Sequence, residues 1–164
     1  MRMDQLTTKL QLALSDAQSI ALDRDHQFIE PAHVLLALLD GEGGAFPNLL
    51  VRAEVNLEIL RVQLASALDR LPAVTGIGGD VQMSVKLDRV LNQSLKLAKN
   101  RDDKYVSSEL FLLAMMIEGI ESSALLTKSG ATRRSVEASI EAMRGTDSVD
   151  EPNAEENRQA LEKY

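Results

Sequence analysis

The chain has 164 residues, a formal net charge of −7, no cysteine and two histidines, and 45% of its residues are apolar. This length suits one ordinary domain, or two small units that share a core. The lack of cysteine excludes disulfides, cysteine-ligated metals and thiol nucleophiles, and the acidic balance argues against binding to nucleic acid. The longest apolar run, residues 110–117, is too short to cross a membrane. We therefore expect a soluble protein of a reducing compartment, the cytoplasm.

The chain repeats itself with a shift of 77 residues. Residues 6–37 align without a gap on residues 83–114, and nine of the 32 pairs are identical, where chance would give about two. We therefore predict two copies of one unit, residues 2–72 and 82–144, with a connector over 73–81. The connector contains Gly-Ile-Gly-Gly, which we interpret as a linker because no strand precedes it and no Gly-Lys-Ser/Thr follows it.

Apolar periodicity predicts the helices of the first unit. An apolar stripe with three- and four-residue steps predicts a first helix that is capped by Thr7 and ends near Asp23. The stripe consists of Leu10, Leu14, Ala17 and Ala21. Pro31 suits the first position of a second helix, where no backbone N–H is required. Residues 35–39 are all apolar, so we expect this helix to be central and buried.

The second unit follows the same plan. We predict that Ser84 caps its first helix and Ser107 its second, with Glu109 placed in the first turn, where a carboxylate interacts favourably with the helix dipole. Third and fourth helices are predicted over residues 46–53 and 57–70, and over 122–129 and 132–143. No segment alternates apolar and polar residues, so we expect no sheet. The predicted fold is all-α, with two pseudo-repeats of a four-helix unit and about eight helices.

The character of the chain changes after the predicted domain, residues 1–145. Residues 146–164 hold six acidic and two basic side chains, so they carry −4 of the net charge of −7. A polar, acidic segment of this kind cannot bury enough apolar surface to form a core. We predict a flexible acidic tether, as expected for an N-terminal piece of a longer protein.

Four stretches of the sequence together resemble the Clp N-terminal domain, and in particular that of ClpB-type AAA+ disaggregases. They are Met1-Arg2-Met3-Asp4-Gln5-Leu6-Thr7-Thr8-Lys9, Gln27-Phe28-Ile29-Glu30-Pro31-Ala32-His33, Ser107-Ser108-Glu109-Leu110-Phe111 and Arg158-Gln159-Ala160-Leu161-Glu162-Lys163-Tyr164. The resemblance implies a substrate-contacting domain of a chaperone that pulls polypeptides out of aggregates in the stress response, together with the DnaK, DnaJ and GrpE chaperones. It implies that residues 146–164 link the domain to missing ATPase modules, which would hold ATP and Mg and build the homohexamer. The present chain is therefore expected to be a monomer without a cofactor.

No residues suggest catalysis. Asp102 and Asp103 are adjacent, but flanking basic residues favour a solvated turn over an acid–base pair. His33 lies among apolar residues and is interpreted as a core histidine, and Glu30 one turn away would give only two metal ligands. We therefore predict that this chain is not an enzyme and holds no metal.

Binding in a seam between the two units is the favoured function. An apolar groove with a polar rim suits the exposed hydrophobic stretches of unfolded or aggregated polypeptides. The candidate groove leucines are Leu91, Leu97 and Leu110. Asp103 and Glu109 are expected near the rim and Thr7 at the same seam, and the resemblance supports these three as substrate contacts. The alternatives are that Thr7 only caps its helix, that Glu109 only serves the dipole, and that the leucines are core.

A second hypothesis is an adaptor-docking, regulatory N-domain of a protease-linked Clp unfoldase, which would bind one folded partner. Relatives such as ClpC often have Pro-Glu-His at the start of the second helix, whereas this chain has Pro31-Ala32-His33. An acidic residue at that position would hold a cationic group such as phosphoarginine, together with Glu109 at the equivalent place in the other unit. Because Ala32 has no charge, recognition of such a group at two sites is not expected here.

Overall fold

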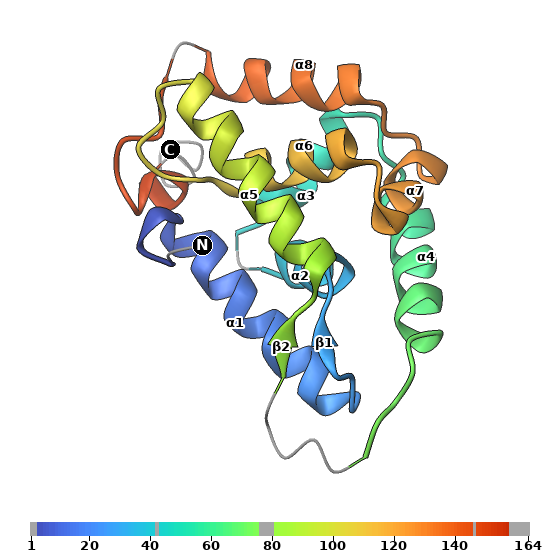
Figure 1. The fold of residues 1–164 in the computed structure, drawn as a ribbon. Helices are drawn as coiled ribbons and strands as arrows, with labels where there is room; N and C mark the ends of the chain where they lie inside the picture. The colour runs from blue at the N-terminus through green and yellow to red at the C-terminus, as the bar shows by residue number, and fades with distance from the viewer. Residues whose placement is uncertain (1–2, 42, 76–80, 146, 158–164) are drawn as a thin grey trace.

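The computed structural model describes residues 3–41, 43–75, 81–145 and 147–157. A short 3-10 helix, η1 (Met3–Gln5), precedes eight α-helices and two short strands, and the described residues end in a further helical turn over 154–157 (Figure 1). In chain order they are α1 (Thr8–Asp23), β1 (Phe28–Ile29), α2 (Pro31–Leu39), α3 (Ala45–Arg52), α4 (Leu57–Asp69), β2 (Gln82–Met83), α5 (Val85–Asn100), α6 (Ser108–Glu118), α7 (Glu121–Lys128) and α8 (Arg133–Arg144). The predicted all-α fold of two four-helix pseudo-repeats is confirmed.

Of the predicted caps, those of the first helices are found at equivalent places in the two repeats, whereas the hydroxyl of Ser107 makes no cap bond to α6 and instead accepts from Arg144. The side-chain oxygen of Thr7 accepts a hydrogen bond from the backbone N–H of Leu10 at 3.3 Å, and that of Ser84 accepts one from Leu87 at 3.0 Å. Each cap satisfies a donor that the first helical turn leaves free. Thr132 forms a capping box at α8 as well, so local sequence signals set the beginnings of three helices.

The second helix of each repeat forms the centre of the molecule. In α2 every residue except Leu36 is buried, and in α6 the first eight residues, 108–115, are buried. Both belong to one continuous hydrophobic core that includes residues of both repeats. The expectation of central, buried second helices is thus confirmed.

The third helix of each repeat packs against the opposite repeat. The hydroxyl of Ser139 in α8 donates to the carbonyl of Leu49 in α3 at 2.8 Å, and the backbone N–H of Asn56 donates to the carbonyl of Ser129 after α7 at 2.8 Å. In consequence α3 lies beside α8, and α4 beside α7 (Figure 1). The repeats therefore interlock instead of meeting at one flat boundary.

The expectation of no sheet is wrong in one detail. Strands β1 and β2 pair in parallel, with Phe28 opposite Gln82 and Ile29 opposite Met83. Each strand has only two residues, which is too short to show the apolar–polar alternation by which a strand is recognised in a sequence.

A second backbone bridge is the repeat equivalent of this small sheet. Leu6 pairs in parallel with Val106, and adding 77 to Leu6 and to Ile29 gives Met83 and Val106. The bridge between Leu6 and Val106 is therefore the repeat equivalent of the pairing between Met83 and Ile29, with the roles of the two units exchanged. As a result the beginning of α1 lies beside the beginning of α6, and that of α5 beside that of α2.

Only the ends of the predicted connector lie within the described residues. Ala73 forms an antiparallel bridge with His26, and the backbone N–H of Val74 donates to the carbonyl of Asp25 at 2.8 Å. The Gly-Ile-Gly-Gly stretch falls in residues 76–80, outside the described part of the chain.

In the described ranges, no single helix has the length and apolar character needed to cross a bilayer, and α6 with α7 would meet that test only as a pair bent by 103°.

Candidate functional site

Two neighbouring cavities open where the two repeats meet. The first, about 220 Å³, lies between α3, the beginning of α6 and the end of α8, and the second, about 410 Å³, lies between α1, α2 and α3. They share Ala45, Phe46, Ser108 and Glu155. We call these two cavities the interrepeat groove.

The walls of the interrepeat groove are largely apolar. They include Leu12, Ala13, Leu38, Phe46, Pro47, Leu49, Val51 and Met143. Leu12 and Val51 are 56% and 55% exposed, so both leave aliphatic surface open to solvent beside the cavities. Lys9, Asp16 and Arg52 add charge among these walls. The groove therefore has apolar walls and charged groups, but its walls come mainly from α1 and α3, and none of the predicted groove leucines, Leu91, Leu97 and Leu110, lines either cavity.

A third cavity is the repeat equivalent of the first. It has about 530 Å³ and lies between the beginning of α2, the end of α4 and α7. Ala32 stands there in the position that Glu109 has in the first cavity, and Lys128 in that of Arg52. Its surroundings are more charged, with Glu30, Arg70, Lys86, Glu121 and Lys128. The two equivalent cavities thus differ in chemistry.

A buried ion-pair cluster underlies the interrepeat groove. Arg144, only 6% exposed at the end of α8, donates to Asp103 at 2.8 Å and to Glu109 at 2.9 Å. Its third hydrogen bond goes to the hydroxyl of Ser107 at 2.8 Å. Burial by itself lowers the pKa of Arg144, but the charges of Glu109 and Asp103 outweigh it, so that the pKa of the guanidinium is raised. The cluster holds α8, the beginning of α6 and the loop between α5 and α6 in one arrangement.

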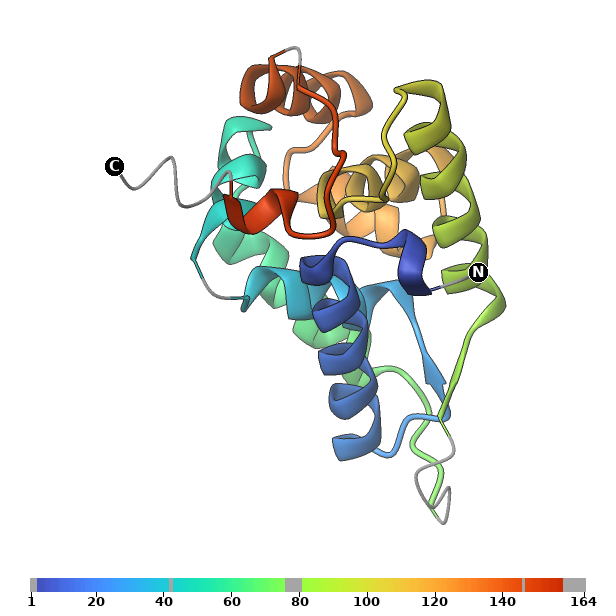
Figure 2. The same cartoon turned by 90° about the vertical axis from the view of Figure 1, so that its left-hand side faces the viewer.

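The described part of the predicted tether lies against the seam. Val149 is fully buried, its N–H donates to a carboxylate oxygen of Asp103 at 3.0 Å, and its carbonyl accepts from Lys104 at 2.8 Å. The carbonyl of Pro152 accepts from the N–H of Thr8 at 2.7 Å. Figure 2 shows this segment descending from α8 and crossing between the beginning of α1 and α3. Residues 147–157 are therefore docked, because one apolar side chain and several backbone groups find partners that a composition-based prediction cannot foresee.

Glu155 of this segment lines both cavities of the groove. Its carboxyl group accepts hydrogen bonds from the hydroxyl of Thr7 and, at 3.2 Å, from the backbone N–H of Ser108. Burial and the nearby charge of Glu109 raise the pKa of Glu155 to about 7, although the bonds from Thr7 and Ser108 act in the opposite direction. One carboxyl group thus joins the beginnings of α1 and α6.

The structure places the six predicted contact residues in different surroundings. Leu91 and Leu110 are fully buried in the core, and Leu97 is partly buried against it. Asp103 and Glu109 are buried in the cluster around Arg144, with Glu109 also lining the first cavity. Thr7 is buried, caps α1 and contacts Glu155. Contact with a bound polypeptide stays a prediction for all six.

His33 is a satisfied core histidine, as expected. Its Nδ1 accepts the backbone N–H of Glu30 at 2.8 Å, and its Nε2 lies 2.8 Å from Nδ1 of His26. Burial and the neighbouring His26 lower the pKa of His33 to about 4. Among the described residues, no group of three or more acidic or histidine side chains is placed to hold a metal ion.

These features define a class of helical double-repeat domain with an apolar groove at its seam. The family model of the Clp repeat (R) N-terminal domain matches residues 5–129. Chaperone protein ClpB of Vibrio cholerae is 49% identical over 164 residues, and that of Pseudomonas putida 47% identical, each over the whole chain but only 19% of the relative. The chain belongs to the Clp N-terminal domain family, and it spans about a fifth of the length of these ClpB relatives.

Solved structures show the same fold. The N-terminal domain of Hsp104 from Candida albicans superposes with a TM-score of 0.80 at 18% identity, over 92% of this chain and 98% of that domain. The N-domain of the ClpV1 ATPase from Escherichia coli superposes with a TM-score of 0.72 at 22% identity, over 83% of each. A complex of a ClpV N-domain with a VipB peptide gives 0.70 at 21% identity, over 85% of this chain and 86% of that one. The prediction of a non-catalytic N-terminal domain, as opposed to an ATPase module, agrees with these matches.

Proposed function

We propose that this chain captures unfolded or aggregated polypeptides in the interrepeat groove and delivers them to an ATP-driven ClpB-type disaggregase. The observation that carries the proposal is the apolar groove between α1, α3 and α6. Burying one large aliphatic or aromatic side chain contributes about 1.5–3 kcal/mol whatever the neighbouring residues are. Such a site accepts many sequences weakly, which is what a disaggregase requires of its first contact with an aggregate.

The relatives support the wider setting of the proposal. The ClpB chaperones that match the chain are about five times its length, so we place ATP and Mg in modules beyond these residues. The same modules would assemble the homohexamer and thread the captured polypeptide, in cooperation with DnaK, DnaJ and GrpE in the cytoplasm during the stress response. In this scheme the present chain by itself is a monomer and performs no catalysis.

An adaptor-docking function is the second candidate. One observation favours it, which is that a similar ClpV N-domain has been solved in complex with a defined peptide of VipB. A domain of this kind would bind one folded partner or one fixed motif. Unrelated unfolded polypeptides would then fail to compete with that partner, whereas they compete with one another in the capture function.

Two matched valine variants test the proposed groove. Val51 is 55% exposed and lines the first cavity, whereas Val62 is 68% exposed on the outer side of α4 and lines none of the three cavities described above. Val51→Ser removes apolar contact worth about 1 kcal/mol, so we expect about fivefold weaker binding of a fluorescently labelled, carboxymethylated and permanently unfolded polypeptide. Val62→Ser should bind as the unaltered chain does. Equal affinities for the two variants would contradict the groove as the binding site.

A further inference from the structure

We propose that residues 149–155 are an internal ligand of the interrepeat groove, which a captured polypeptide must displace. The inference rests on the proposed function and adds a means of regulation to it. Its basis is geometric, because the segment crosses the groove at the place where the two cavities meet. Glu155 lines both cavities, and Glu156 lines the second. A polypeptide that extends from one cavity to the other must pass through the space that Glu155 occupies.

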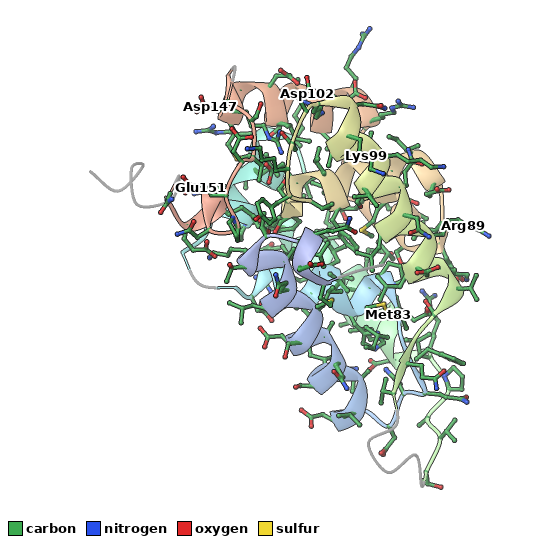
Figure 3. All side chains as sticks on the ribbon, turned by 60° about the vertical axis from the view of Figure 1, so that its left-hand side comes forward. Met83, Arg89, Lys99, Asp102, Asp147 and Glu151 are labelled. Carbon is green, nitrogen blue, oxygen red and sulfur yellow. The ribbon has the colours of Figure 1, made fainter. Side chains whose placement is uncertain are left out.

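Two residues anchor the segment, in addition to the bond from the backbone N–H of Thr8 to the carbonyl of Pro152. The first is Val149, whose side chain is fully buried and whose backbone forms hydrogen bonds with Asp103 and Lys104 in the loop between α5 and α6. The second is Glu155, which bonds to Thr7 and Ser108 inside the groove. Figure 3 marks Asp147 and Glu151 along the path of the segment from α8 towards α1. Because Val149 lines neither cavity, altering it weakens the attachment of the segment without changing the walls of the groove.

Favourable and unfavourable contributions nearly cancel in the contacts that Glu155 makes inside the groove, which favours its replacement by a polypeptide. Glu155 makes two hydrogen bonds there, but its carboxyl group loses water and lies near Glu109. The free-energy cost of removing a carboxyl group from water and placing it beside another acid offsets much of what its hydrogen bonds contribute. The segment also has five acidic and no basic residues over 147–157. We therefore expect the population of the docked form to exceed that of the undocked form only modestly, so that apolar side chains of a polypeptide can replace the segment.

The fraction of molecules with an open groove sets the expected change in polypeptide affinity. When only a fraction of molecules has an open groove, the apparent dissociation constant rises by the inverse of that fraction. Loss of the two hydrogen bonds of Glu155, offset in part by the renewed hydration of its carboxyl group, changes the equilibrium constant between the docked and undocked forms by about tenfold or less. We therefore expect release of the segment to tighten polypeptide binding by about 3- to 10-fold.

The test compares two releasing variants with one matched control at pH 7. Glu155→Ala removes the attachment inside the groove, and Val149→Asp removes the attachment outside it. Asp150→Ala removes an exposed carboxylate from the same segment and is the control. Binding of the carboxymethylated, unfolded polypeptide is followed by fluorescence anisotropy, with thermal melting of each variant to verify the helical fold. Both releasing variants should bind about 3- to 10-fold more tightly than the unaltered chain, and the control should not.

A second measurement uses the unaltered chain. Saturation with the unfolded polypeptide should move the NMR signals of the Val149 methyl groups to the values of an exposed valine. Methyl signals that stay unchanged in the complex, or releasing variants that bind no more tightly than the control, would overturn the inference while leaving the capture function intact. Failure of the unaltered chain and of every variant to bind would refute the capture function, and the inference would fall with it.

Discussion

The guanidinium of Arg144 donates from Nε to an oxygen of Glu109 at 2.9 Å, which joins the end of α8 to the first turn of α6. The same guanidinium reaches Asp103 at 2.8 Å on the loop that precedes α6. All three side chains are almost completely buried. One cation thus compensates two carboxylates in the floor of the interrepeat groove, and each acid depends on it.

The first prediction concerns this dependence. Arg144→Ala leaves Asp103 and Glu109 buried without their cation, and breaking a buried ion pair on one side costs about 3–5 kcal/mol. We expect a loss of this size in the free energy of unfolding, measured by urea titration with circular dichroism. Arg134→Ala, which changes an exposed arginine on the same helix, should cost less than about 0.5 kcal/mol. Similar losses for the two variants would show that the buried cluster contributes little.

The cluster has a neutral counterpart in the first repeat. A shift of 77 residues places His26 on Asp103, and His26 also fastens the loop between the first and second helices. Because His33 Nδ1 accepts from the N–H of Glu30, its Nε2 carries the proton and donates to Nδ1 of His26. Two neutral imidazoles thus hold this loop in the first repeat, as the ion pair between Arg144 and Asp103 holds the equivalent loop in the second.

The second prediction is a loss of stability in acid that comes from this histidine pair. The pKa of His33 is lowered to about 4, mainly by burial, so the folded protein resists protonation that the unfolded chain accepts. Its contribution is complete above the unfolded pKa of about 6.5 and is lost as the pH falls towards 4. The expected loss is about 2–3 kcal/mol, measured by urea titrations between pH 7.5 and 4 on the Glu155→Gln variant, because the raised pKa of Glu155 gives the unaltered chain a pH dependence of opposite sign. An NMR titration of the His33 imidazole with a midpoint near 6.5 would contradict this prediction.

Much of the fold follows from local signals. The apolar stripe of α1 and the caps Thr7, Ser84 and Thr132 place helices to within a residue or so, because helical periodicity and capping involve neighbours in the sequence. The repeat then transfers the plan from one unit to the other. Thr7 contacts Glu155 beside the interrepeat groove and Glu109 lines its first cavity, while contact of either residue with a polypeptide stays a prediction.

The remaining features depend on contacts between distant parts of the chain. The bond between Thr7 and Glu155 spans 148 residues, and an acidic segment gives no local indication of docking. The burial of Arg144 had a usable signal, since it continues the four-residue steps of Val136 and Ile140 on the buried side of α8. Leu110 follows a cap and precedes an apolar run, a pattern that does not distinguish a groove wall from a core.

The third prediction concerns two glycines in the left-handed region of the backbone. Gly130 has a φ of +114°, and a Cβ there would stand 2.4 Å from the carbonyl oxygen of Glu54. Gly119 has a φ of +59° with no atom within 4 Å of such a Cβ. We expect Gly130→Ala to lower the free energy of unfolding by about 2–4 kcal/mol, and Gly119→Ala by about 1 kcal/mol. Equal losses in urea titrations would mean that the close approach to Glu54 has no energetic weight.

The fourth prediction concerns the pH dependence of the docked segment. Burial and the charge of Glu109 raise the pKa of Glu155 to about 7, so the docked form holds a proton that the released form gives up. Docking is therefore strongest below the ordinary pKa of a glutamate, about 4.5, and weakens as the pH rises through 7. Glu109 faces the carboxyl group from α6 with Arg144 of α8 as its partner, and Lys9 and Asp16 of α1 line the same groove.

The Val149 methyl groups report docking in NMR spectra and are not themselves titratable. Between pH 6 and pH 8.5 their signals should move towards those of an exposed valine, with a midpoint above the ordinary range of a glutamate. Glu155→Gln supplies the control, because an amide accepts the same hydrogen bonds from Thr7 and Ser108 but has no charge to lose at this pH. Its Val149 signals should stay at their docked positions throughout. If the unaltered chain shows no more change than this variant, ionisation of Glu155 does not control the segment.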